Sequence, residues 1–92
     1  MSRLAPLPAK TLCKVFEKAG FSCVRFEGDH FVYTKPGVIR PIVIPDWPAV
    51  PVFIIKNNLR SAGISREKFF ELLQEILVGS RNSLGQAIYL PI

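Results

Sequence analysis

The hydrophobic positions near the N-terminus recur with the period of an α-helix. After a proline-containing lead-in over residues 1–8, apolar residues occupy positions i, i+3, i+4 and i+7 of one helix face: Leu12, Val15, Phe16 and Ala19. Gly20 follows as a left-handed C-terminal stop. The opposite face carries three lysines that lie four residues apart: Lys10, Lys14 and Lys18. The pattern predicts an amphipathic helix whose basic stripe is either a solvated face or a surface that contacts phosphates.

The next part of the chain changes to short runs rich in β-branched and aromatic residues. These runs are Phe21–Phe26, His30–Lys35 and Ile39–Ile44. Glu27-Gly28-Asp29 and Pro36-Gly37 separate them, and both are turn signals, because glycine tolerates a positive φ and proline presets the first turn angle. Since connections this short join antiparallel neighbours, the sequence predicts a three-stranded antiparallel meander.

Two more helices are predicted after a stiff loop. Residues 45–51 contain three prolines, which exclude regular structure. Trp47 in this loop is interpreted as a lid packed over the core, with a base-stacking or partner-docking surface as the alternative. The following helix covers Phe53–Ala62 and ends at Gly63, and Ser65 caps a further helix that ends at Gly79.

The chain length favours a single α+β domain over residues 1–92, with helices on one face of the sheet. We expect a lead-in (1–8), a core (9–78) that includes an extra C-terminal helix, and a tail (79–92). The apolar end of this tail, Ala87–Ile92, either adds a strand to its own sheet, which we favour, or docks onto another chain, so tail-mediated self-association stays open. No apolar run approaches the roughly 20 residues that span a bilayer, and the N-terminus lacks a secretion signal. We therefore expect a cytoplasmic protein with no membrane partner.

The charge is concentrated in the first two thirds of the chain. Residues 1–60 contain nine Lys or Arg and four acidic residues, whereas residues 61–92 contain three of each. Such an asymmetry is typical of a protein that binds a polyanion such as RNA, although it also serves solubility. The two cysteines, Cys13 and Cys23, are interpreted as small core residues of a protein in a reducing compartment, rather than as a disulfide or a reactive thiol.

Candidate chemistry centres on the single histidine, His30. Histidine exchanges a proton near neutral pH without special tuning, and His30 opens the second predicted strand directly after the Gly28 turn, a rigid and accessible position. A lone histidine is, however, more often structural. Asp29 would orient His30 only if the turn bends there, since adjacent side chains of an extended chain point to opposite faces. One histidine and no acidic cluster argue against a metal site.

Three segments of the chain resemble the HicA-like (YcfA-like) toxin family. Lys18-Ala19-Gly20-Phe21 and Gly28-Asp29-His30 are similar in spacing to that family's helix end and to the Gly-Ser-His that opens its next strand. The likeness continues through Arg40–Pro45 and Leu59–Ser65, and covers roughly residues 8–75. The resemblance implies an α-β-β-β-α double-stranded-RNA-binding-like fold and a ribonuclease toxin that acts on mRNA. It also implies a HicB-like antitoxin partner, His30 as the catalytic residue, and no metal or other cofactor.

The resulting hypothesis is an endoribonuclease in which His30 acts as general acid or base. Six basic residues would hold the RNA backbone: Lys10, Lys14, Lys18, Arg25, Lys35 and Arg40. Two alternatives remain. The domain binds structured RNA without cutting it, or it is an inactive relative that pairs with a regulatory protein through Trp47 and the tail.

Overall fold

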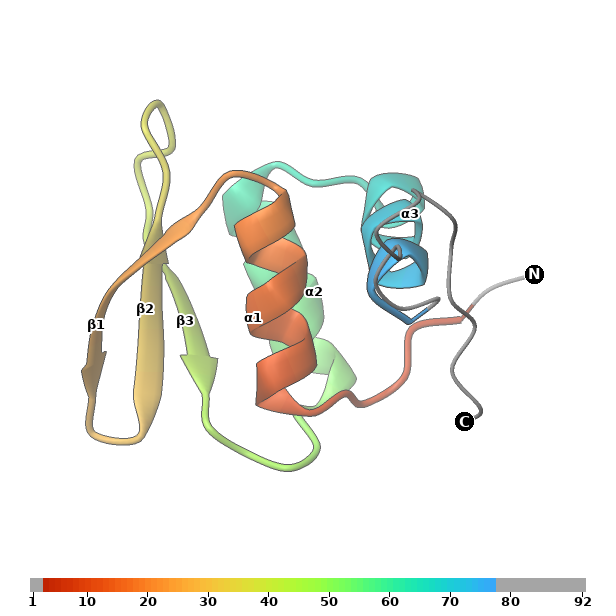
Figure 1. Ribbon diagram of the computed structural model, residues 1–92, viewed down its shortest axis with the longest axis horizontal. Coiled ribbons are helices and arrows are strands. Elements are labelled where there is room, and N and C mark those ends of the chain that lie inside the picture. The colour runs from red at the N-terminus through yellow and green to blue at the C-terminus, as the bar shows by residue number, and fades with distance from the viewer. Residues whose placement is uncertain (1–2, 78–92) are drawn as a thin grey trace, which may run out of the picture.

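The structure is a computed structural model that describes residues 3–77 (Figure 1). The elements follow in the order α1 (Ala9–Lys18), β1 (Ser22–Glu27), β2 (His30–Thr34), β3 (Ile42–Pro45), α2 (Val52–Ala62) and α3 (Arg66–Leu77). This order confirms the predicted α+β fold, including the α-β-β-β-α core and the extra C-terminal helix. The predictions for Gly79 and for Ala87–Ile92 lie outside the described residues.

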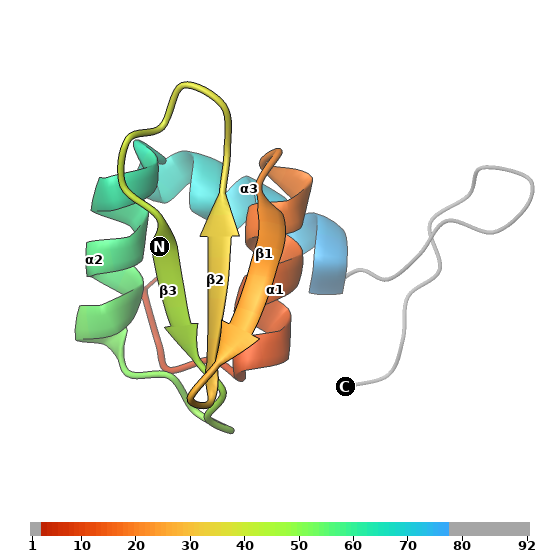
Figure 2. The same cartoon turned by 90° about the vertical axis from the view of Figure 1, so that its left-hand side faces the viewer.

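The three strands form an antiparallel sheet in the order β1-β2-β3, as predicted. α1 and α2 cover one face of this sheet, and α3 contacts α1 on the side away from the strands (Figure 1). The opposite face of the sheet has no helix of residues 3–77 over it (Figure 2). Within the same residues, no helix has the length and apolar character needed to cross a membrane.

The hydrophobic core lies between the sheet and the helices. Its residues with no accessible surface come from α1, β3, α2 and the loop before α2: Leu12, Val15, Phe16, Ile42, Ile44, Val50 and Ile55. The apolar face predicted for α1 is therefore buried, apart from Ala19, which is half-buried. Each such side chain contributes about 1.5–3 kcal/mol by leaving water, so this interface fixes the positions of the sheet and helices.

Two helix ends show why the predicted boundaries hold. Gly63 ends α2 with a φ of 71°, a left-handed conformation that glycine adopts without strain. Ser65 precedes α3, and its hydroxyl accepts a hydrogen bond from the Lys68 N–H at 3.1 Å, which confirms the predicted N-terminal cap. α2 begins one residue earlier than predicted, at Val52, directly after Pro51.

The prediction for the third strand was wrong at its start, which is Ile42 and not Ile39. The turn after β2 is longer than the Pro-Gly pair suggests, because the Val38 N–H donates to the Lys35 carbonyl and the chain pairs with β2 only from Ile42 onward. Ile39 is consequently 97% exposed.

Two side chains are more exposed than predicted, Cys23 as a core residue and Trp47 as a lid packed over the core. Cys13 is buried as expected, but Cys23 lies on the edge strand β1, all of whose residues are exposed. Trp47 retains 45% of its accessible surface, so it does not form a buried lid. The loop instead buries Val50, whose N–H and carbonyl pair with the backbone of Leu7 in the lead-in.

Candidate active site

A tight hairpin turn positions His30 at the start of β2. Gly28 and Asp29 connect β1 to β2 with φ values of 57° and 63°, so both turn residues are left-handed, as a two-residue type I′ hairpin requires. Glycine adopts this conformation freely, and aspartate tolerates it better than most residues. The turn places Glu27 directly opposite His30 in the strand ladder.

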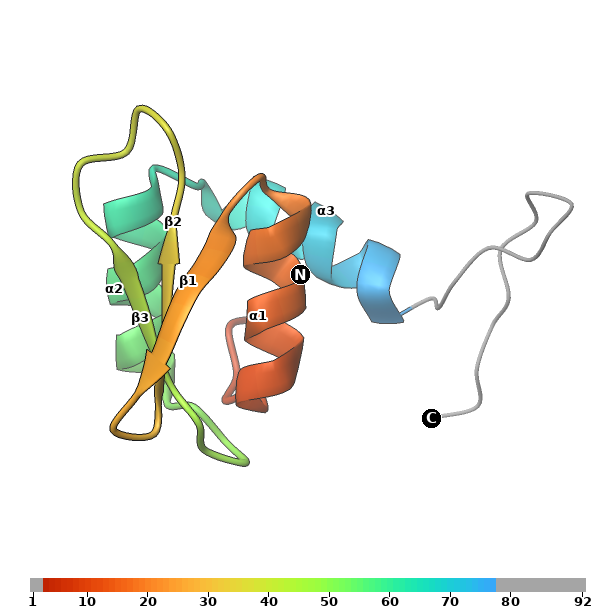
Figure 3. The same ribbon diagram turned by 60° about the vertical axis from the view of Figure 1, so that its left-hand side comes forward.

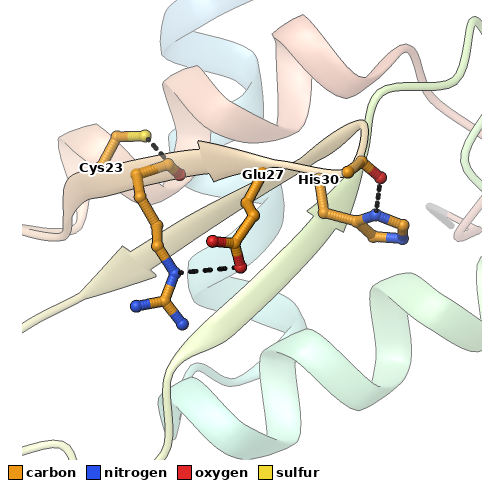
Figure 4. A network of polar contacts seen from close by, with 5 residues as sticks. Cys23, Glu27 and His30 are labelled. Atoms are coloured by element: carbon orange, nitrogen blue, oxygen red, sulfur yellow. Dashed lines mark hydrogen bonds and ion pairs between the residues drawn. The ribbon is translucent and has the colours of Figure 1, made fainter.

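The His30 ring is oriented by the backbone of the same turn. Its Nδ1 lies 2.7 Å from the Gly28 carbonyl oxygen (Figure 4). Since a carbonyl can only accept a hydrogen bond, Nδ1 must carry a hydrogen and donate it. In the neutral ring, Nε2 then holds the lone pair, and it is the atom available to take up or release a proton. The group that orients the ring is thus the Gly28 carbonyl, and no hydrogen bond joins Asp29 and His30 within residues 3–77.

His30 lies on the open face of the sheet. Alternate residues of a strand point to opposite faces, and Phe31 and Tyr33 pack into the helix-covered core, so His30 and Val32 point the other way. The register brings Arg25 opposite Val32 and Glu27 opposite His30. The side chains of Glu27 and His30 extend from the same side of the hairpin (Figure 4), and His30 is partly exposed. The imidazole is thus accessible beside a carboxylate.

The hairpin tip is held by the loop that follows β3. His30 pairs with Pro45 in the ladder, and the Asp46 N–H donates to the Asp29 carbonyl at 2.9 Å. The same loop reaches α1, because the Ala9 N–H donates to the Trp47 carbonyl at 3.0 Å. The hairpin tip, this loop and the beginning of α1 therefore meet at one end of the molecule (Figure 3).

The basic stripe of α1 does not lie on the face that carries His30. Lys10, Lys14 and Lys18 are all exposed. Lys10 belongs to the first turn of α1, and the start of this helix is its end nearer the hairpin tip (Figure 1). Lys18 forms an ion pair of 3.4 Å with Glu75 of α3, on the side of α1 away from the sheet. The structure therefore separates the far end of the stripe from the histidine.

The other three basic residues have three different surroundings. Arg25 shares the open face with His30, and its Nε lies 3.8 Å from Glu27 Oε1, an exposed pair of little energetic weight. Lys35 donates to the Ala19 carbonyl at 2.8 Å and lies 5.6 Å from the centre of the Phe21 ring, so it stabilises the C-terminal end of α1. Arg40 lies in the loop between β2 and β3, at the opposite end of β3 from His30.

The comparison with protein families decides the relationship of this chain. A family model described as the HicA toxin of bacterial toxin-antitoxin systems matches residues 9–64. The chain belongs to the HicA toxin family. The matched span runs from the first residue of α1 to just beyond α2, so α3 is outside it. Among curated proteins no match is found.

HicA toxins pair with an antitoxin, and members of the family are generally mRNA interferases. In this HicA chain the candidate site is the hairpin tip with its oriented histidine. Within residues 3–77 there is no group of three or more His, Cys, Asp or Glu side chains that could hold a metal ion.

Sequence reasoning missed Glu27 as a neighbour of His30. The signal was present, because a two-residue turn makes the flanking residues a ladder pair, and Gly28-Asp29 has that length. Sequence reasoning also missed that Arg60 of α2 lies at the same hollow as Arg40. Both residues line one hollow, but they are far apart in the sequence, and no local pattern brings them together.

Proposed function

We propose that this chain is the toxin of a toxin-antitoxin pair and acts as a metal-independent endoribonuclease on mRNA. The observation that supports it most is the 2.7 Å contact between His30 Nδ1 and the Gly28 carbonyl. This contact leaves Nε2 as a defined proton acceptor on an accessible face. We further propose that the protein works in the cytoplasm and that a HicB-like antitoxin covers the hairpin tip.

In the proposed reaction, neutral His30 takes the proton of an RNA 2′-hydroxyl through Nε2. The 2′-oxygen then attacks the neighbouring phosphorus, and the bond from phosphorus to the 5′-oxygen breaks. The products are a 2′,3′-cyclic phosphate and a 5′-hydroxyl end. One histidine cannot both accept the first proton and donate the second in the same step, so water protonates the leaving 5′-oxygen, and we expect a slow enzyme.

Glu27 supports this step electrostatically. Residues directly opposite in an antiparallel ladder have their Cβ atoms about 4.5–5.5 Å apart, and Glu27 is opposite His30. When Nε2 accepts the proton, the ring becomes positively charged beside this carboxylate. Opposite charges at such a position attract, so the product of the proton transfer is stabilised.

The test is incubation of purified protein with a labelled mRNA in excess EDTA. Two variants are compared with the wild type. His30→Ala removes the ring, and His30→Asn keeps an N–H that can donate to the Gly28 carbonyl but cannot exchange a proton near neutral pH. We expect both variants to cleave about 10²–10⁴ times more slowly, with circular dichroism spectra and melting temperatures close to the wild type.

The outcomes are separable. Loss of cleavage in a folded His30→Asn protein assigns the activity to proton exchange and not to the hairpin hydrogen bond. Equal cleavage by all three proteins, or none by the wild type, contradicts the proposal. RNA binding without cleavage would identify a non-catalytic binding domain instead.

A further inference from the structure

A hollow lies at the opposite end of β3 from His30. It has a volume of about 530 Å³ and is lined by residues 37–40 of the β2–β3 loop and residues 60–63 at the end of α2. The hollow is open to solvent on one side, and Ile39 on its rim is almost fully exposed. Core side chains therefore do not fill it.

The charged groups of this hollow are two arginines. Arg40 approaches from the loop and Arg60 from the last turn of α2. Both are exposed, and neither forms an ion pair within residues 3–77. No acidic residue lines the hollow. Two arginines at one hollow bring like charges into the same region, and an anion bound there would relieve their repulsion.

The partial negative charge at the C-terminal end of α2 repels an anion in the hollow only weakly. A helix C-terminus carries about half a negative charge, and part of it is already satisfied here, because the Gly63 N–H donates to the carbonyls of Arg60 and Leu59. Two full positive charges outweigh it. A stabilising contact with the helix end explains a basic residue at position 60, but it does not explain Arg40, which comes from a different segment.

A further basic residue of α2 lies between the hollow and the end of the molecule that carries the hairpin tip. Lys56 is exposed and lies one turn before Arg60 on the same side of α2. α2 lies beside β3 and runs from the end near the hairpin tip to the β2–β3 loop (Figure 2). Pro45, the ladder partner of His30, follows Arg40 by five residues. An extended chain spans this distance in about 17 Å. A single nucleic-acid strand can therefore follow this edge of the molecule.

We propose that Arg40 and Arg60 form a phosphate-binding subsite for an RNA strand whose scissile bond lies at His30. Guanidinium groups suit this task because their planar arrangement of donors matches the oxygens of a phosphate. This inference rests on the proposed ribonuclease function for the identity of the strand. It assigns a distal binding role that is separate from the proton transfer.

The test measures binding of a labelled single-stranded RNA by fluorescence anisotropy over a range of salt concentrations. All proteins carry His30→Ala and the RNA is 2′-O-methylated, so the strand lacks the attacking 2′-hydroxyl and stays intact whichever residue is the catalyst. We expect Arg40→Ala and Arg60→Ala each to weaken binding. Each should lower the salt dependence, the slope of log K against log salt, by about 0.7 for the one phosphate that is lost. The double variant should lose little more than either single variant, because both arginines hold the same phosphate.

Two control variants separate this subsite from net charge. Arg3→Ala removes the same charge from an exposed arginine of the lead-in, the segment that reaches the start of α1 from the side away from the sheet (Figure 1). Its affinity and salt slope should match the His30→Ala parent. Arg60→Lys should keep most of the slope, because it keeps the charge. RNA shortened one nucleotide at a time should lose the arginine dependence in one step.

The result that overturns the inference is an Arg40→Ala or Arg60→Ala protein that binds RNA like Arg3→Ala, with melting temperatures unchanged. Failure of the nuclease proposal looks different, since the His30 variants would then cleave like the wild type while the arginine variants still weakened binding. If both proposals hold, Arg60→Ala in a cleaving protein raises KM and leaves kcat unchanged, which marks a residue that binds substrate and transition state equally.

Discussion

The hydrogen bond between Tyr33 and Glu17 offers a direct test of how α1 is attached to the sheet. The Tyr33 hydroxyl donates to Glu17 Oε2 at 2.6 Å, and the Tyr33 side chain is buried, with 3% of its surface exposed. Tyr33→Phe keeps the ring in the core and removes the hydroxyl, and with it this bond and a weaker contact with the Cys13 thiol. A hydrogen bond to a charged group contributes about 1.5–3 kcal/mol. Because Glu17 is exposed and water can replace the lost partner, we expect a loss of about 1–2 kcal/mol.

Urea unfolding at pH 7 measures this loss. For a chain of this size, a change of 1–2 kcal/mol corresponds to a shift of about 1 M or slightly more in the urea midpoint and about 5–15 °C in melting temperature. Glu17→Gln and the double variant complete a cycle that isolates the coupling between the two side chains. A loss below about 0.3 kcal/mol, or additive single losses, would refute the view that this bond attaches α1 to β2.

The buried Tyr33 hydroxyl also predicts a dependence on alkaline pH. Burial raises the pKa of this hydroxyl well above its usual value of 10, and the hydrogen bonds with Cys13 and Glu17 add to the rise. The unfolded chain loses this proton above pH 10, whereas the folded chain keeps it. The stabilisation is thus complete below pH 10 and is lost as the pH rises, by up to about 1.4 kcal/mol per pH unit. Between pH 10 and 11 the wild type should therefore lose more stability than Tyr33→Phe, and equal losses would contradict this assignment.

Two further predictions test the sequence-based interpretation of Lys35 and of the two cysteines. Lys35→Met should lower the unfolding free energy by about 0.5–1 kcal/mol, because it removes the contacts with the Ala19 carbonyl and the Phe21 ring. It should leave RNA affinity almost unchanged, and a large loss of affinity with unchanged stability would show that Lys35 binds RNA instead. Burial raises the pKa of the Cys13 thiol, whereas Cys23 is exposed. A disulfide-exchange reagent should therefore modify one thiol per native chain and two in urea, and rapid modification of both in the native protein would count against the structure.

The fold was largely predictable because its strongest signals are local. The apolar spacing of α1 is the period of a helix, and the core it forms buries Leu12, Val15 and Phe16 completely. The turns at Gly28 and Gly63 were predictable because their positive φ values suit glycine. Cys23 was misplaced because β-strand composition does not reveal which strand lies at the sheet edge.

The orientation of His30 was not predictable, because it depends on the turn geometry and not on residue type. The acceptor is the carbonyl of Gly28, a group that every residue possesses, and it reaches Nδ1 only because Gly28 and Asp29 are both left-handed. A sequence shows which side chains are able to exchange protons. It does not show which ring nitrogen the backbone leaves available, and that choice decides which atom of the histidine acts as the base and where it lies.

The basic residues show that sequence spacing alone also does not locate a binding surface. A regular spacing of lysines along α1 suggested one continuous surface, yet Lys18 pairs with Glu75 from a helix 57 residues away in the sequence. Lys35 is bound to the end of α1 in a similar way. Arg40 and Arg60, by contrast, form no ion pair within residues 3–77, and they line one hollow although they are far apart in the sequence. An excess of charge along a sequence therefore predicts a polyanion partner, but tertiary contacts decide which charges remain available to bind it.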